Sequence, residues 1–395
     1  MSVELTIRFN SVNRLPVVAD PRTAPAYLNT ADFFDRFPDY VSTKLMKAGI
    51  KGDDAKKIER FLIDRYEENS QKALCTKTDL TISKSDSSLP YSFVFDPSGE
   101  VYIKAHFLQF VKGTLKIKKL AISAFSGIRY IRLVAHIDNP DIKPEKVIEY
   151  MTNEASILQS LKGIKSIVQI QKISRGMTKK GKDRFSLYEQ ECPQGDLFDN
   201  LQKLNDSERL HIADCLIQGV KELHSRNIVH RDLKPENIYL HGKALKEAVI
   251  GDFNLALYLP LENATPDISG TLEYFSPEKA HCYLVQNFPN GRQERQSDIW
   301  ALGFIFLDLF FPTCAFGPEY NAMYVNWNHS SKEKKLRFLK NLANPHRFEQ
   351  NQQKFLSKPC ATKKLSNLVH GMLQIDPNKR STIDQVADQW KKIYA

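Results

Sequence analysis

The sequence predicts an α+β fold with two lobes, a small lobe rich in strands and a large helical lobe, preceded by a mainly helical extension. Three strand-like runs, one amphipathic helix and two more strand-like runs follow one another within residues 98–190. Residues 191–395 carry mainly helical patterns. We therefore expect three parts: an N-terminal module of unknown role at 1–97, the small lobe at 98–190 and the large lobe at 191–395.

The N-terminal module combines a short strand with two helices. Residues 3–9 alternate like a strand, and residues 31–74 have the pattern of two helices broken near Gly49 and Gly52. A small helical core is expected from Leu45, Ile50, Ile58, Phe61, Leu62 and Tyr66. The module is either a docking or regulatory unit or a structural extension packed on the rest of the chain.

The small lobe is predicted from β-branched and aromatic runs at 100–110, 114–123, 128–137, 167–173 and 184–191. Between the third and fourth runs, residues 144–163 form an amphipathic helix with Val147, Met151, Leu158 and Leu161 on one face. Glu154 falls on the same apolar face. Because a carboxylate that faces a core is costly without a partner, we expect a cation opposite Glu154.

The large lobe contains the chemically most informative stretch, residues 229–254. Asp232 can accept or orient a hydroxyl proton, and Lys234 brings a positive charge close to it. Asn237 and Asp252 offer the hard oxygen ligands that Mg²⁺ prefers. Phosphoryl transfer from ATP needs these parts, a positioned acceptor and cations that neutralise the phosphates.

This stretch resembles the catalytic loop and metal-binding turn of eukaryotic-type protein kinases. His230-Arg231-Asp232 matches His-Arg-Asp, and Asp252-Phe253-Asn254 matches Asp-Phe-Gly except at its last position. Asparagine tolerates positive φ, so the turn is expected to survive this change. The resemblance implies transfer of the γ-phosphate of ATP, with Mg²⁺, to protein substrates, and Lys234 favours serine and threonine over tyrosine.

Other segments of the large lobe match the same family. Residues 188–192 resemble the hinge that reads adenine, and Asp196 the acidic residue near the ribose. The remaining matches are Thr271 with the threonine that contacts the catalytic loop, Ser276-Pro277-Glu278 with Ala-Pro-Glu, Asp298 with the aspartate that holds the loop backbone, and Arg380 with the arginine that pairs Glu278. Residues 207–226 form a helix that delivers the catalytic loop.

Residues 255–275 resemble an activation segment with three phosphorylatable hydroxyl groups, on Thr265, Ser269 and Thr271. Arg231, beside the catalytic aspartate, is suited to receive a phosphate. A segment that is ordered without modification is the alternative.

The small lobe departs from the family's pattern at the residues that would contact the nucleotide. In the family, a lysine that contacts ATP pairs with the glutamate that Glu154 resembles. Arg132 stands 22 residues before Glu154 and is expected in place of this lysine, with His136, Lys143 and Lys104 as alternatives. The phosphate-binding loop keeps only Gly113, or Gly127 on another alignment. These departures, together with Asn254, motivate a second hypothesis, a pseudokinase that binds partners. A kinase fold with another nucleotide-dependent transfer activity is a further alternative.

Composition limits the class of protein, the compartment and the partners expected of the 395-residue chain. Its 42% hydrophobic residues suit a globular protein, and its six scattered cysteines suit reduced thiols in a cytosol-like compartment. No secretory signal is recognised at the start, and the run at 299–316 has the pattern of a buried helix. The +10 charge is spread along the chain, so a solvated surface is expected and no nucleic acid.

The predicted location is the cytoplasm. The divergent small lobe beside a well-matched large lobe is similar to eukaryotic-like kinases that intracellular bacteria deliver into host cells, which makes a host cytosol the second possibility. A regulatory protein partner on the N-terminal module or the large lobe is expected beside the protein substrate.

Overall fold

The computed structural model describes residues 40–109, 116–135, 143–177, 183–242, 247–311, 331–344 and 363–394. The chain divides into two compact units. The first comprises Met1–Lys112, Ile117–Val134 and Ser174–Ser186, and the second Gly113–Lys116, Ala135–Ile173 and Leu187–Ala395.

The first unit begins with the predicted pair of helices. Helix α2 spans Tyr40–Lys47 and α3 spans Gly52–Thr76, so the chain breaks at the two glycines that marked the turn. Lys77 closes α3 in a left-handed conformation, with φ of 53°. The strand predicted at residues 3–9 lies outside the described residues.

One seven-stranded sheet follows the helices, in the order β1-β2-β3-β4-β5-β7-β6. Its strands are β1 (Leu80–Ile82), β2 (Ser92–Phe95), β3 (Val101–Gln109), β4 (Lys116–Ser123), β5 (Arg129–Ala135), β6 (Ile170–Met177) and β7 (Asp183–Gln190). Neighbours from β1 to β4 pair antiparallel. The last five strands agree with the predicted runs, whereas β1 and β2 add strands to the predicted helical module.

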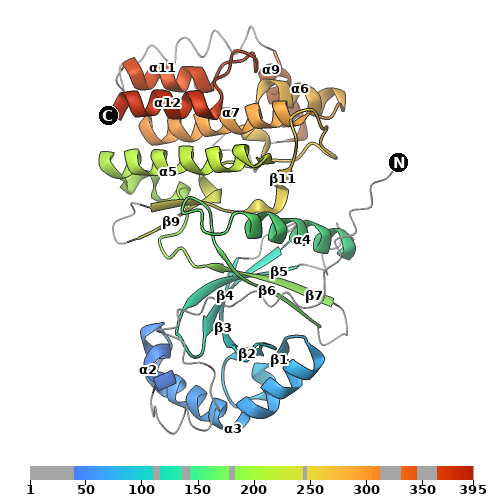
Figure 1. The fold of residues 1–395 in the computed structure, drawn as a ribbon, viewed down its shortest axis with the longest axis vertical. Coiled ribbons are helices and arrows are strands. Elements are labelled where there is room, and N and C mark those ends of the chain that lie inside the picture. Colours follow the sequence, from blue (N-terminus) through green and yellow to red (C-terminus); the bar gives the residue numbers. More distant parts are fainter. Residues whose placement is uncertain are drawn as a thin grey trace. The chain divides into compact units, whose positions relative to one another are not determined.

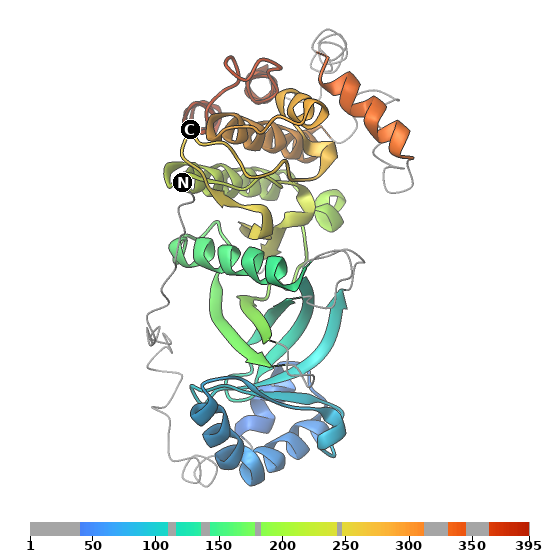
Figure 2. The same ribbon diagram turned by 90° about the vertical axis from the view of Figure 1, so that its right-hand side faces the viewer.

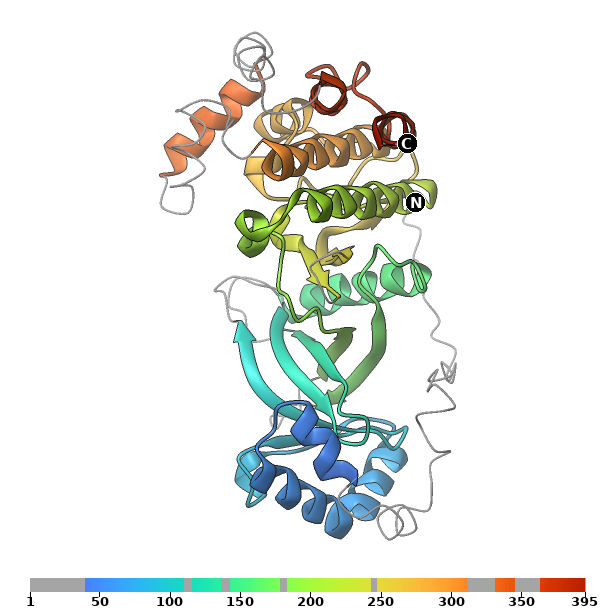
Figure 3. The ribbon, with the colours of Figure 1, turned by 90° about the vertical axis from the view of Figure 1, so that its left-hand side faces the viewer.

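The helices share a hydrophobic core with these strands. Leu45, Ile58 and Leu62 are fully buried in one cluster with Phe93 and Ile103, among others. Figures 2 and 3 show α2 and α3 beside the first strands of the sheet. A Cβ at Gly127, whose φ is 71°, would lie 2.6 Å from the carbonyl oxygen of Lys44, so this turn requires glycine. The core therefore joins residues on both sides of the predicted boundary at residue 97.

The second unit holds most of the helices (Figure 1). They are α4 (Pro144–Ser160), α5 (Asp206–Ser225), α6 (Pro277–Val285), α7 (Gly291–Phe310), α9 (Lys332–Leu342), α11 (Lys363–Met372) and α12 (Ile383–Tyr394). Asn205 begins α5 with a capping box, because its side chain accepts from Glu208 N–H and the Glu208 carboxylate accepts from Asn205 N–H. The predicted helices at 144–163 and 207–226 are confirmed.

Helix α7 is the centre of this unit. Its residues from Ser297 to Leu307 are buried, and Trp300 has no exposed surface. The helix packs against α5, α6 and α11, so the described part of the predicted apolar run, from Ile299 to Phe310, is a buried helix. The rest of the run, at 312–316, lies outside the described residues. Among the described residues, no helix is long and apolar enough to cross a membrane.

Two short antiparallel strand pairs frame the loops of the second unit. Strand β8 (Ile228–Val229) pairs with β11 (Leu257–Tyr258), and β9 (Ile238–His241) pairs with β10 (Glu247–Ile250). The loop at 230–237 runs from β8 to β9, and the turn at 251–256 runs from β10 to β11. These pairings bring the loop and the turn together although they are separate in the sequence.

Candidate active site

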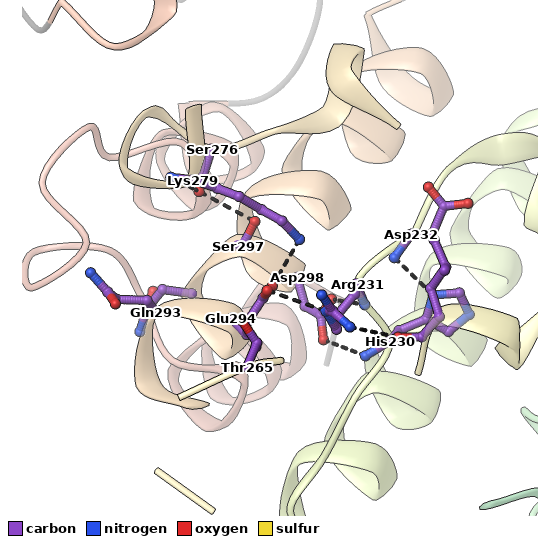
Figure 4. Close-up of polar contacts among 12 residues, drawn as sticks. His230, Arg231, Asp232, Thr265, Ser276, Lys279, Gln293, Glu294, Ser297 and Asp298 are labelled. Atoms are coloured by element: carbon purple, nitrogen blue, oxygen red, sulfur yellow. Dashed lines mark hydrogen bonds and ion pairs between the residues drawn. The ribbon is translucent and has the colours of Figure 1, made fainter. Parts of the chain in front are cut away.

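Helix α7 fixes the backbone of the loop that follows β8. The buried carboxylate of Asp298 accepts hydrogen bonds from the backbone N–H groups of His230 and Arg231, each at 2.9 Å, and contacts Nε2 of His224 at 3.0 Å. Burial alone would raise the pKa of Asp298, but the hydrogen bond and charge of His224 lower it, so the carboxylate stays ionised. Figure 4 shows Asp298 between the helix and this loop.

Asp232 is the centre of a hydrogen-bonded cluster. Its Oδ1 accepts from the backbone N–H of Thr271 at 2.8 Å and from the Thr271 hydroxyl at 2.6 Å. Its Oδ2 accepts from Nδ2 of Asn237 at 3.0 Å and lies 3.3 Å from Nζ of Lys234. Lys234 also donates to Oγ1 of Thr271 at 2.8 Å. Three predicted side chains, two from the same loop and one from the segment at 255–275, thus meet at the Asp232 carboxylate.

Asn237 and Asp252 lie at the same end of the β9–β10 pair, because Asn237 precedes β9 and Asp252 follows β10. Because Nδ2 of Asn237 donates to Asp232, the amide oxygen is turned to the other side. The backbone N–H of Gly251 donates to the Asn237 carbonyl at 2.8 Å, which joins the loop to the turn. The Asp252 side chain is 19% exposed, so its carboxylate is within reach of a bound group.

The turn itself differs from the expectation for Asn254. The positive φ, 59°, belongs to Asp252, and the next three residues form a 3-10 turn at Phe253–Leu255. Asn254 lies within that turn at negative φ, so it needs no special tolerance there. A left-handed aspartate is strained, and such strain is common in functional loops.

The cation that lies against Glu154 is Lys116, at the start of β4. Its Nζ is 2.5 Å from Oε1 of Glu154 and 3.0 Å from Oδ1 of Asp252, and its side chain is 5% exposed. Glu154 has no exposed surface, as its place on the apolar face of α4 predicted. Burial alone would lower the pKa of Lys116, but the carboxylates of Asp252, Glu154 and Glu189 raise it, so the ammonium stays charged.

This ion pair corrects the prediction of Arg132. Arg132 lies on β5, and its Nη2 donates to Oγ of Ser186 at 3.0 Å. Lys143 is exposed at the start of α4, and Lys104 on β3 lies opposite Ala121 in the register. His136 and Gly113 lie outside the described residues. The prediction was wrong because it placed the cation on β5, the strand before α4, whereas the cation lies one strand earlier, on β4.

One further predicted contact, between Arg380 and Glu278, stabilises the large lobe. Arg380 binds Glu278 through two hydrogen bonds, Nη1 to Oε1 at 2.7 Å and Nη2 to Oε2 at 2.9 Å, across 102 positions of sequence. Its guanidinium also lies 5.0 Å from the ring centroid of Trp300. A bidentate pair of this kind is stronger than a single hydrogen bond, so it ties α6 to the start of α12.

The predicted hinge begins inside β7. Tyr188 and Glu189 are buried within the strand, and Cys192 follows its end. Burial, helped by the charges of Glu189 and Glu191, raises the pKa of the Cys192 thiol to about 12, so the thiol stays protonated. Asp196 accepts from the backbone N–H of Asp199 at 3.0 Å and so begins the next turn.

The sequence profile of the protein kinase domain matches residues 128–390, about two thirds of the chain. The chain belongs to the protein kinase family. The matched range of this kinase domain begins within the small lobe and leaves out β4, which carries Lys116. That limit agrees with a small lobe that departs from the family's motifs.

Several curated serine/threonine kinases are similar to this kinase domain. A probable serine/threonine-protein kinase of Dictyostelium discoideum is 30% identical over 214 residues, which is 50% of this chain and 40% of the relative. Human NUAK family SNF1-like kinase 1 is 27% identical over 286 residues, 71% of this chain and 37% of the relative. The liver/testis phosphorylase b kinase gamma catalytic chain of Mus musculus is 30% identical over 196 residues, 48% and 42% respectively. The chain thus spans roughly two fifths of the length of these relatives.

Proposed function

We propose that this protein transfers the γ-phosphate of ATP to serine and threonine hydroxyl groups of protein substrates. One observation carries the proposal: Asp232 shares hydrogen bonds or close contacts with Lys234, Asn237 and Thr271. The buried ion pairs of Lys116 with Glu154 and Asp252 in the same unit support it. Both arrangements fit a reaction that depends on positioning and on charge neutralisation rather than on covalent catalysis.

Each side chain has a role in this proposal. The Asp232 carboxylate orients the acceptor hydroxyl and takes its proton, while Lys234, 3.3 Å away, stabilises the negative charge on the transferred group. Lys116 is held in place by Glu154 and presents its ammonium to the phosphates of the nucleotide. Thr271 ties the activation segment to both members of the catalytic pair.

The side chains that face the turn fit Mg²⁺. Asn237 presents an amide oxygen and Asp252 a partly exposed carboxylate, both of them hard ligands. The described part of the chain has no cluster of three or more acidic, histidine or cysteine side chains that could hold a metal. Mg²⁺ needs only one or two carboxylates when phosphates and water complete its shell, and when bound it neutralises phosphate charge.

Specificity for serine and threonine rests on Lys234. This lysine contacts Asp232 and Thr271 at once, so it occupies the space beside the acceptor hydroxyl. The name of the similar Dictyostelium discoideum protein, a probable serine/threonine-protein kinase, agrees with this specificity. The alternative of a partner-binding pseudokinase loses one of its reasons, because Lys116 supplies the missing cation.

The experiment is transfer of labelled γ-phosphate from MgATP to the protein itself and to a generic basic protein, followed by phosphoamino acid analysis. The control is Asp232→Asn, which keeps the size of the side chain and removes its charge. We expect phosphoserine or phosphothreonine from the wild type and a loss of at least ~10³-fold in the variant. Equal signal from both proteins ends the proposal, and AMP in place of phosphate in the product mass indicates nucleotidyl transfer.

A further inference from the structure

Arg231, beside the catalytic aspartate, is already bound by two carboxylates. Its side chain is 2% exposed, and Nε donates to Oε1 of Glu294 at 3.2 Å. Its Nη2 donates to the Asp267 carbonyl at 2.9 Å and also to the Asp267 carboxylate. Its Nη1 reaches the carbonyl of Leu255 at 3.3 Å. The guanidinium therefore connects the catalytic loop to α7, to the metal-binding turn and to the activation segment.

The charges around Arg231 are balanced. Glu294 has no exposed surface and also accepts from Nζ of Lys279 at 2.8 Å. Two cations, Arg231 and Lys279, thus face two carboxylates, Glu294 and Asp267 (Figure 4 labels all but Asp267). Burial alone would raise the pKa of Asp267, but the hydrogen bond and charge of Arg231 lower it, so Asp267 is ionised at neutral pH.

The activation segment also lies against α4, the helix that carries Glu154. Nδ2 of Asn153 on α4 donates to the carbonyl of Ala256 at 2.8 Å. Tyr150, also on α4, is close enough to Asp267 for this carboxylate to add to the burial that raises the pKa of Tyr150. The segment is therefore bound to the catalytic loop through Asp267 and to α4 through Asn153.

The hydroxyl groups that a protein kinase could modify in this segment are already engaged. Thr265 is buried, and its Oγ1 donates to the Asp267 carbonyl at 2.7 Å. Ser269 lies close enough to Asp267 to help to lower the pKa of that carboxyl group. Thr271 is bound to Asp232. A Cβ at Gly270 would collide with the carbonyl oxygen of Arg231, so the segment lies directly against the catalytic loop.

We propose that Asp267 is a positioning residue that binds Arg231 permanently, as a phosphorylated residue of the segment otherwise would, so that the active site assembles without phosphorylation. This inference rests on the proposed kinase function. In this proposal the carboxylate of Asp267 binds Arg231 in place of a phosphate on Thr265, Ser269 or Thr271. A phosphate added to the segment would find the Arg231 guanidinium already occupied by Asp267 and Glu294.

The kinetic test compares phosphatase-treated wild type with Asp267→Asn, Asp267→Glu and Glu262→Gln. Glu262 is a matched control, because it lies in the same segment but pairs with Arg292 at the exposed surface. We expect the treated wild type and Glu262→Gln to keep their initial rates within about twofold. For Asp267→Asn we expect kcat to fall at least ~10-fold with KM for ATP nearly unchanged, and Asp267→Glu to recover part of kcat. A tenfold loss on phosphatase treatment, or an Asp267→Asn variant as fast as the wild type, overturns the inference.

Hydrogen exchange gives a second readout that does not depend on turnover. The backbone N–H of Thr265 donates to the Pro289 carbonyl at 2.9 Å, and that of Thr271 to Asp232 at 2.8 Å. Both amides are expected to be protected in the dephosphorylated wild type and to exchange at least ~10-fold faster in Asp267→Asn. Equal exchange in the two proteins overturns the inference. If the wild type transfers no more phosphate than Asp232→Asn, the proposed function fails, and the exchange result alone decides the role of Asp267.

Discussion

Replacing Lys116 by methionine tests the assignment of the cation that the sequence did not reveal. Methionine keeps much of the length and apolar volume of the lysine stem but removes its charge. The ammonium lies within 3.0 Å of two carboxylates, and Glu154 is fully buried. The variant therefore leaves a buried carboxylate without this cation.

The magnitude follows from that burial. Removing one partner of a buried ion pair costs ~3–5 kcal/mol of stability, part of which Glu154 recovers by taking up a proton. Removing a positioned charge from an active site costs ~10²–10³-fold in rate, equivalent to ~2.7–4 kcal/mol. We therefore expect Lys116→Met to remain folded at low temperature and to lose at least ~100-fold in kcat/KM for MgATP.

The assay measures initial rates at a temperature at which circular dichroism reports folded protein for every variant. Arg132→Met is the comparison, because Arg132 is equally buried and was the residue predicted from spacing. It loses its hydrogen bond to Ser186, which is worth ~1–3 kcal/mol of stability, but its rate should stay within about threefold. The assignment of Lys116 as the cation that contacts the nucleotide is refuted if Lys116→Met keeps more than about a tenth of the activity, or if folded Arg132→Met loses as much activity as Lys116→Met.

Three further predictions concern stability and the metal-binding turn. Burial, with the nearby charge of Glu236, raises the pKa of Asp308 to about 7 from an ordinary 3.8, so ionisation destabilises the folded state increasingly between pH 4 and 7; urea unfolding should show that the free energy of unfolding of Asp308→Asn, relative to that of the wild type, increases from pH 5 to pH 8 by at most ~3 kcal/mol, and an equal difference at both pH values contradicts this. Leu62→Ala should cost ~2–5 kcal/mol in urea unfolding followed by circular dichroism, and the exposed neighbour Ile63→Ala less than ~0.5 kcal/mol; similar losses would exclude the core assignment. Asn254→Gly should change kcat by less than about twofold, because no positive φ is needed at that position, and a large gain in rate would contradict this.

Much of the large lobe was predictable because its proposed functional residues lie in short motifs with fixed spacing. Asp232, Lys234 and Asn237 occupy one loop, so their order along the chain already determines their proximity. The pairing of Glu278 with Arg380 spans 102 positions but was recognised from the family.

The small lobe was harder to predict, because its contacts depend on which strands are neighbours. Glu154 was correctly expected to be buried opposite a cation, yet the identity of that cation depends on the sheet order rather than on distance along the chain. The lysine that opens the strand after Gly113 was a signal that could have identified it. Strands β1 and β2 were missed because they are short and follow a long helix. The regulatory partner and the cellular location stay predictions.

The apolar cluster shared by α2, α3 and the first strands limits where an expressed fragment of this protein can begin. A fragment that starts at residue 98 would lose both helices and expose Ile103 and Ile122 to water. A fragment that starts at residue 128, where the family match begins, would lose the whole cluster together with β3 and β4. Such fragments are expected to aggregate during expression. The cause would be the N-terminal truncation and not an unstable large lobe. An expression plasmid for this protein should therefore begin no later than Tyr40.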